Sequence, residues 1–225
     1  MQLPERVKSI SPNDKVLEIG PGGLPHPRAD VFLELAYEDK TIAEEQRGHA
    51  PELKTKKPIV YYDGSHFPFK DKEFDYIICS HVLEHVPDIE FFLSEIFRVG
   101  RKGYLEYPLI YYEYLYNFNA HLNILKFKDS LLYYLKKSDI PLSEFKNVQS
   151  LFHQTLTSGY KSFIAELRDY VFEGFEWSEP FSSIKASGIS DLVWDEINIP
   201  SRKEDPFISK YLFLKGLLYN LFKRK

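Results

Sequence analysis

The sequence predicts an α/β protein with a doubly wound, mainly parallel sheet. Short, mostly apolar segments of β-forming residues recur through the first half of the chain, as expected for parallel strands buried on both faces. An amphipathic helical segment lies between the last two of them. A strand, a helix and a further strand form a right-handed crossover between parallel neighbours. Ligands of such sheets bind at the carboxyl ends of the strands.

Five segments carry the strand prediction. They are 15–20, 29–35, 58–64, 74–80 and 103–108. The helix between the last two is predicted to begin after Asp88, which can cap it, and to stop at Gly100. Apolar residues of 89–97 recur at three and four positions and so form one buried face.

After Pro108 the sequence becomes rich in tyrosine and other β-forming residues. Residues 128–130 form a predicted turn between the runs 121–127 and 131–136, which indicates a hairpin. The later elements are predicted to be helix over about 142–170 and strands within 175–187. An inserted hairpin or lid region is therefore expected after the fifth strand.

We expect one domain, 1–225, because the length suits a single domain better than two. Its predicted parts are a ligand-binding core over about 10–108, a substrate or lid region over about 109–170, and C-terminal strands with a basic amphipathic helix over about 171–225. The segment from Tyr104 to Tyr116 holds six tyrosines. They suit either interior packing or contact with sugars and flat ligands.

Composition excludes some classes of function. The net charge of -4 gives no basic excess for holding nucleic acid, so no nucleic-acid partner is expected. Cys79 is the only cysteine, which excludes an internal disulfide and a cysteine zinc cluster. No apolar run approaches the roughly 20 residues of a membrane span, and the first residues lack a signal-peptide pattern. We expect a cytoplasmic protein.

The segment 207–225 is basic and apolar, with five bases, no acids and eleven apolar residues among 19. A helix of this kind can lie at a membrane surface. It can equally pack on its own domain or in a homodimer. Peripheral membrane contact and a homodimer are both kept as expectations.

A glycine turn follows the first predicted strand. It contains Glu18, Gly20, Pro21, Gly22 and Gly23. Glycines let the backbone approach a ligand closely. Three prolines within 21–27 remove amide donors and disfavour the helix on which a dinucleotide's pyrophosphate would rest. The carboxylate of Glu18 also opposes a phosphate, so the turn favours a ligand that carries an amine.

Further polar residues end the other predicted strands. Glu34 follows the turn by only 14 positions (34 minus 20), where about 20 is usual for the acid that binds a ribose. The first helix is therefore expected to be very short or replaced by a loop, and Glu38 or Asp39 could serve instead. The remaining strand-end residues are Asp63, Gly64, Ser65, Ser80 and His81.

These residues carry a resemblance. "VLEIGPGG" and "DGSHFPFKDKEFDYIICSHVLEHVPD" resemble the class I S-adenosylmethionine-dependent methyltransferases, and more narrowly the domains with an LPF…FD…LEH signature. The resemblance covers about residues 15–108 and implies a Rossmann-like fold with S-adenosylmethionine as cofactor.

The resemblance also implies roles. Glu18, Gly20, Pro21, Gly22 and Gly23 would hold the methionine end of the cofactor. Glu34 would bind the ribose hydroxyls, and Asp63, Gly64 and Ser65 the adenine edge. Ser80 and His81 would lie beside the sulfonium and the substrate entry.

A hydroxyl acceptor needs a base to take its proton. His81 and His121 are weak candidates, with His66, His85 and Glu84 as others; His85 is expected to be structural. No metal site is expected. His81 and His85 stand four apart, but Glu84 does not follow the first histidine as in the metalloprotease motif.

The sequence thus predicts a methyltransferase that acts on a small-molecule or glycan acceptor, on oxygen. One alternative is a catalytically inactive scaffold or regulatory module with the same fold. A nicotinamide-dependent dehydrogenase is disfavoured by the prolines and by Glu18.

Overall fold

The computed structural model describes residues 1–37, 53–156 and 159–195. The chain divides into two compact units, 1–193 and 194–225, and the first holds every element below. The predicted basic helix at 207–225 lies outside the described residues, as do Glu38 and Asp39. Among the described helices, none has the length and apolar character to cross a bilayer.

The main sheet has six strands in the order β3-β2-β1-β4-β5-β8. Its strands are β1 (Val16–Ile19), β2 (Val31–Leu35), β3 (Ile59–Tyr62), β4 (Phe74–Ser80), β5 (Gly100–Pro108) and β8 (Phe172–Trp177). The first five are parallel, and β8 pairs with β5 antiparallel. The structure thus confirms the predicted α/β fold and all five predicted strands.

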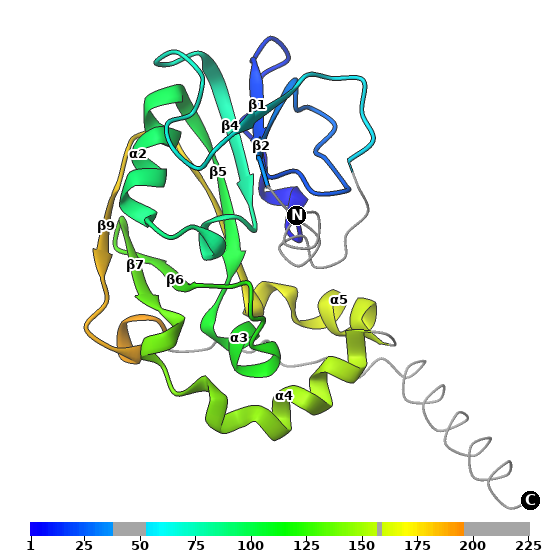
Figure 1. Ribbon diagram of the computed structural model, residues 1–225, viewed down its shortest axis with the longest axis vertical. Helices are drawn as coiled ribbons and strands as arrows, with labels where there is room; N and C mark the ends of the chain where they lie inside the picture. Colours follow the sequence, from blue (N-terminus) through cyan, green and yellow to red (C-terminus); the bar gives the residue numbers. More distant parts are fainter. Residues whose placement is uncertain (38–52, 157–158, 196–225) are drawn as a thin grey trace, which may run out of the picture. The chain divides into compact units, whose positions relative to one another are not determined.

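Helix α2 (Ile89–Val99) joins β4 to β5. The carboxylate of Asp88 caps it by accepting a hydrogen bond from the amide of Phe91 at 2.9 Å, and the helix ends at Gly100. Its buried apolar residues are Ile89, Phe92, Leu93, Ile96 and Val99. Figure 1 shows the helix lying along one side of β4 and β5. Both predicted ends of this helix are confirmed.

A second sheet has three strands, β6 (Asn123–Lys128), β7 (Leu131–Lys136) and β9 (Ser182–Lys185). Strands β6 and β7 form the predicted hairpin, and Asp129 and Ser130 make its turn with positive φ angles of 51° and 61°. Strand β9 adds parallel to β7. This sheet and the helices around it form the lid region (residues 109–171 and 182–193).

The helices of the lid region lie beyond the carboxyl ends of the main strands. They are α3 (Ile110–Tyr116), α4 (Lys146–His153) and α5 (Tyr160–Val171). In Figure 1 the arrowheads of β4 and β5 point toward the part of the molecule that holds them. The short 3-10 helices are η1 (Pro4–Arg6), η2 (Leu83–His85), η3 (Lys137–Asp139), η4 (Leu142–Phe145), η5 (Gln154–Leu156) and η6 (Ile189–Asp191).

Helix α3 was not anticipated from the sequence. Its residues "IYYEYLY" are mostly β-formers, so local propensity disfavours a helix. Packing decides in favour of the helix, because Tyr112 and Tyr116 are both buried in one cluster with Phe172. Asn117 ends the helix in the left-handed conformation, with φ of 48°.

Candidate cofactor site and its neighbouring histidine–glutamate cluster

The carboxyl ends of the parallel strands bring the predicted ligand residues to one edge of the main sheet. No helix intervenes between β1 and β2; residues 21–30 form a loop, as the early position of Glu34 predicts. The amide of Gly20 donates to the carbonyl of Leu33 at 2.9 Å, which ties this loop to β2.

The glycine turn requires glycine at two places. Gly20 and Gly22 have φ angles of +59° and +57°, which side-chain-bearing residues rarely adopt. A Cβ on Gly20 would also lie only 2.7 Å from a methyl of Val82. The turn therefore packs directly against the segment that follows β4.

Glu18 is buried at 4% exposure on β1, and its carboxylate accepts a hydrogen bond from the amide of His26 at 2.8 Å. Burial raises the pKa of Glu18 to about 7, and the nearby charge of Glu34 adds to the increase. A cationic ligand beside Glu18 would offset this cost.

Glu34 lies one residue before the end of β2 and is also buried, at 7% exposure. Asp63, just after β3, is exposed and accepts hydrogen bonds from both the amide and the hydroxyl of Ser65. These bonds hold the pKa of Asp63 below its ordinary value. Gly64 between them has a φ of +91°. The structure thus brings two buried acids and one exposed Asp turn to neighbouring strand ends.

Ser80 and His81 end β4 beside a buried carboxylate that sequence reasoning missed. Glu106 on β5 is 1% exposed and accepts hydrogen bonds from the hydroxyls of Ser80 (2.9 Å) and Tyr104 (2.7 Å). The amides of Gln2 and Leu3 donate to it at 2.6 and 2.9 Å. The sequence signal that could have identified Glu106 is its position as the one acid in the mostly apolar predicted strand 103–108.

His81 has a φ of 58° and its ring lies between two acids. Nε2 is 2.9 Å from Glu106 Oε1, and Nδ1 is 3.3 Å from Glu84 Oε1. The ring N–H groups do not point directly at these oxygens, so the contacts are ion pairs by distance. Burial opposes the charge, but the two acids outweigh burial and raise the pKa of His81 to about 9. A protonated imidazole cannot accept a proton, so this geometry disfavours His81 as a base.

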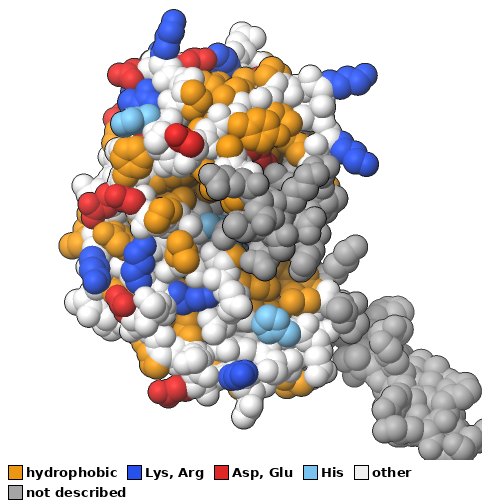
Figure 2. Space-filling view, in the orientation of Figure 1, with side chains coloured by type: hydrophobic (Ala, Val, Ile, Leu, Met, Phe, Trp, Pro, Cys, Tyr) orange, Lys and Arg blue, Asp and Glu red, His pale blue; other side chains and the backbone are white. Residues whose placement is uncertain are grey.

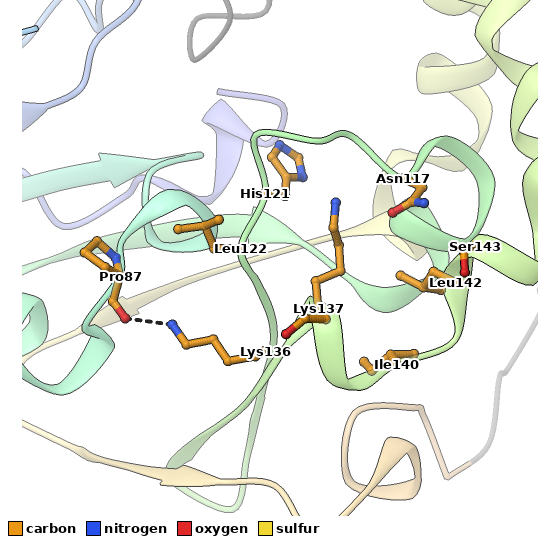
Figure 3. Close-up of a pocket in the computed structure, with 10 residues that line it drawn as sticks. Pro87, Asn117, His121, Leu122, Lys136, Lys137, Ile140, Leu142 and Ser143 are labelled. Atoms are coloured by element: carbon orange, nitrogen blue, oxygen red, sulfur yellow. Dashed lines mark hydrogen bonds between the residues drawn. The ribbon is translucent and has the colours of Figure 1, made fainter. Parts of the chain in front are cut away.

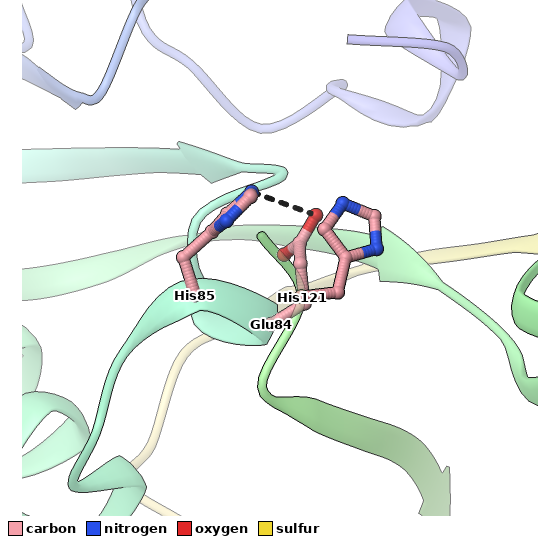
Figure 4. Close-up of side chains that lie close together, drawn as sticks. All are labelled: Glu84, His85 and His121. Atoms are coloured by element: carbon pink, nitrogen blue, oxygen red, sulfur yellow. Dashed lines mark ion pairs between the residues drawn. The ribbon is translucent and has the colours of Figure 1, made fainter. Parts of the chain in front are cut away.

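Glu84, His85 and His121 form a second group, the histidine–glutamate cluster. One possible ligand atom from each lies within 4.8 Å of those of the other two. Glu84 and His85 belong to η2, and His121 precedes β6. Figure 4 shows both rings turned toward the carboxylate. Burial raises the pKa of Glu84, but the surrounding histidines outweigh it, and the net shift is downward.

A cavity of about 470 Å³ lies beside this cluster, with His121 in its wall. Figure 3 shows that Pro87 and side chains of the lid region surround it. The polar lining residues are Asn117, His121, Lys136, Lys137, Ser138 and Ser143. Lys136 donates to the carbonyl of Pro87 at 2.6 Å, which closes one side. Pro87, Leu122, Ile140 and Leu142 complete the lining, so the cavity has both polar and apolar walls.

The other sequence candidates lie elsewhere. His66 is exposed and its Nδ1 is 3.1 Å from Glu95 on α2, away from the cluster. Four of the six tyrosines in 104–116 are buried: Tyr104, Tyr107, Tyr112 and Tyr116. Interior packing therefore explains most of the tyrosine-rich segment.

On the face drawn in Figure 2, acidic and basic side chains alternate among hydrophobic ones without forming a field of one sign. Such mixing is ordinary for a protein surface.

Comparison with protein families gives one match, a methyltransferase domain over residues 18–105. This segment is less than half of the chain. It begins at Glu18 and ends within β5, so it covers the carboxyl ends of β1, β2, β3 and β4 but not Glu106. No curated protein sequence matches the chain.

Several solved structures are similar in part. A S-adenosylmethionine-dependent methyltransferase from Thermotoga maritima is 23% identical over 48% of this chain and 50% of its own, with a TM-score of 0.33. One from Mesorhizobium loti is 13% identical over 74% of this chain and 91% of its own, with a TM-score of 0.40. The chain thus spans about half the length of the Thermotoga protein. The part of the chain that the structure describes thus has an α/β fold with a mainly parallel main sheet, and its residues 18–105 match a methyltransferase domain.

Proposed function

We propose that this protein transfers a methyl group from S-adenosylmethionine to an oxygen of a small-molecule or glycan acceptor. The observation that carries the proposal is the pair of buried carboxylates, Glu18 and Glu34, beside a glycine turn at the carboxyl edge of the sheet. Both lie inside the segment that matches the methyltransferase domain.

Each predicted residue has a part in holding the cofactor. Glu18 pairs with the ammonium group of the methionine end, which relieves the cost of its burial. Gly20 and Gly22, with Pro21 and Gly23, let the backbone pass close to that end. These assignments rest on the buried position of Glu18 and on the positive φ angles of the turn.

The other end of the cofactor meets the next two strands. Glu34 accepts from the ribose hydroxyls, and the Asp63–Ser65 turn faces the adenine edge. Ser80 and His81 border the reaction centre. The bound cofactor supplies a methyl group already activated by its sulfonium. The protein's own task is to bring the acceptor oxygen into line with that methyl.

The acceptor is assigned to the cavity beside His121. Polar side chains line it together with Leu122, Ile140 and Leu142, which favours an acceptor that carries hydroxyl groups on a partly apolar framework. The narrower LPF…FD…LEH likeness supports the methyltransferase assignment but does not specify the acceptor.

The test is calorimetry with S-adenosylhomocysteine, followed by transfer of labelled methyl from S-adenosylmethionine to a panel of sugars, glycans, phenols and hydroxy acids. We expect binding at one site per chain and label in a hydroxyl-bearing acceptor. A Glu34→Ala variant should lose most of the affinity. Absence of binding would contradict the proposal, and binding without transfer to any acceptor would favour the inactive module.

A further inference from the structure

We propose that Glu84, His85 and His121 form a binding site for one divalent transition-metal ion of the Zn²⁺ type. The proposal departs from the expectation of no metal that the sequence motif gave. It rests on three features of the histidine–glutamate cluster: an unsatisfied buried carboxylate, two histidines of fixed orientation, and a backbone that holds them together.

Glu84 is the first feature. Its side chain is fully buried, and neither carboxylate oxygen accepts a hydrogen bond from the part of the chain that the structure describes. Its ion-pair contacts among the described residues are with His81 Nδ1 at 3.3 Å and His85 Nε2 at 3.9 Å, both on the same oxygen. The His81 cation offsets part of the cost of burying this carboxylate, and its two oxygens keep lone pairs that a bound metal ion could take.

The histidines are the second feature. His85 Nδ1 lies 2.9 Å from the carbonyl oxygen of Ala120. A carbonyl can only accept, so Nδ1 carries the proton and the lone pair of Nε2 is left on the side of Glu84. Histidines that bind metals characteristically donate their other ring N–H to a carbonyl or carboxylate.

His121 is also oriented through its Nδ1 atom, but by a carboxylate in place of a backbone carbonyl. Its Nδ1 contacts Glu113, which is itself buried at 1% exposure and lies 3.3 Å from the Lys137 ammonium. In Figure 4 one ring nitrogen of His121 faces Glu84 and the other points away. Both imidazoles are thus oriented by partners outside the cluster, with a free nitrogen directed inward.

The backbone is the third feature. The amide of Leu122 donates to the carbonyl of Glu84 at 2.7 Å. The side-chain amide of Asn123 donates to the carbonyls of Leu83 and Val86, at 3.3 and 2.7 Å. These bonds lock η2 to the segment that carries His121. The candidate ligands are therefore held near one another before any ion binds.

Two imidazoles and one carboxylate are a ligand set of catalytic zinc sites, in which the fourth position stays open. Mg²⁺ and Ca²⁺ prefer oxygen ligands alone. Ligand atoms of a tetrahedral zinc site lie about 3.4 Å apart, so the cluster, with separations up to 4.8 Å, must contract slightly on binding. His121 also lines the 470 Å³ cavity, so the cluster and the cavity share this side chain. If the proposed methyl transfer holds, the open fourth position would take an acceptor oxygen.

The test is titration of the chelator-treated full-length protein with Zn²⁺ by calorimetry, and with Co²⁺ by visible absorption. We expect one ion per chain and the intense absorption of a tetrahedral Co²⁺ site. His85→Ala, His121→Ala and Glu84→Gln should each weaken Zn²⁺ binding about 100-fold or more, and Glu113→Gln about 10- to 100-fold. Thermal melting of every variant checks that it folds.

His66→Ala is the matched control, because His66 also contacts an acid, Glu95, but lies outside the cluster. Its Zn²⁺ affinity should equal that of the wild type. No stoichiometric binding, or equal affinities for wild type and Glu84→Gln, would overturn the proposal. S-adenosylhomocysteine binding is measured on the same samples. Its absence would count against the proposed function and leave the metal result standing.

Discussion

Two buried glutamates of the main sheet have opposite electrostatic properties. Glu18 on β1 accepts a hydrogen bond from the amide of His26, and burial raises its pKa to about 7. Glu106 on β5 is buried too, but four donors and the ring of His81 outweigh burial and lower its pKa to about 2. Burial alone therefore does not decide the charge of a carboxylate; its partners do.

This difference in pKa distinguishes a carboxylate with a structural role, Glu106, from a carboxylate that is a candidate ligand-binding group, Glu18. The protein itself supplies the partners of Glu106, which makes that residue a fixed anion between β4, β5 and the N-terminal segment. Glu18 lacks a comparable set, so a ligand's positive group has most to gain there. Four predictions test this contrast, from the largest expected effect to the smallest.

Replacing Glu106 by alanine should cost about 3 to 5 kcal/mol of unfolding free energy, because it leaves the partly buried His81 cation and four donors without their acceptor. Urea denaturation followed by circular dichroism measures the loss. Glu73→Ala is the control; its ion pair with Lys15 is partly exposed and should be worth no more than about 1 kcal/mol. Similar losses for the two variants would contradict the structural role of Glu106.

Glu18→Gln should weaken S-adenosylhomocysteine binding by about 10- to 100-fold, since it removes a charge-assisted contact. Because the pKa of Glu18 is about 7 in the free protein, wild-type affinity should rise from pH 6 to pH 8 as the carboxylate forms. The variant should lose this dependence. Calorimetry at several pH values tests both, with Glu73→Gln as control. If Glu18→Gln bound S-adenosylhomocysteine as tightly as the wild type does, Glu18 would not belong to the binding site.

His81→Gln should reduce the loss of unfolding free energy that the wild-type protein shows as the pH rises above 6.5. The pKa of His81 rises from 6.5 to about 9 on folding, so its stabilising contribution is complete below pH 6.5 and is lost as pH rises through 9. We expect a wild-type decline on the order of 2 kcal/mol over that interval. Urea melts at pH 6, 7.5 and 9 give the profile. Equal slopes in the two proteins would show that His81 is not the titrating group.

Asp63→Ala should weaken S-adenosylhomocysteine binding only about two- to tenfold, because the residue is exposed and contributes ordinary hydrogen bonds. The melting temperature should not change. The control variant for calorimetry is Asp71→Ala, because Asp71 is also an exposed aspartate but has no predicted part in cofactor binding. If both variants bind equally well, Asp63 takes no part in holding the adenine.

The sequence predicted what depends on local pattern. Apolar runs located all five parallel strands, and the Asp88 cap with the Gly100 stop fixed both ends of α2. The early position of Glu34 predicted the loop that replaces the first helix. Helix α3 was missed because burial of Tyr112 and Tyr116 against Phe172 overrides the β-forming tendency of its residues.

The sequence predicted only those residues of the candidate site that lie at the ends of strands. Glu18, Glu34 and Asp63 each end or border a strand, so their meeting at one edge follows from a parallel sheet. The contacts of Glu106 with Gln2 and of His121 with Glu84 join positions far apart in sequence. No local pattern encodes such pairs, because the first depends on how the N-terminal segment packs on the sheet and the second on how the lid region does.

The path of the chain through the lid region limits how this protein could be recombined with others. After β7 the chain returns to the main sheet as β8 and only then comes back as β9 to pair with β7. The lid region is therefore not a single insertion that can be cut out at two points. A chimera that takes this region from another protein would have to exchange 109–171 and 182–193 together, while keeping β8 from the recipient.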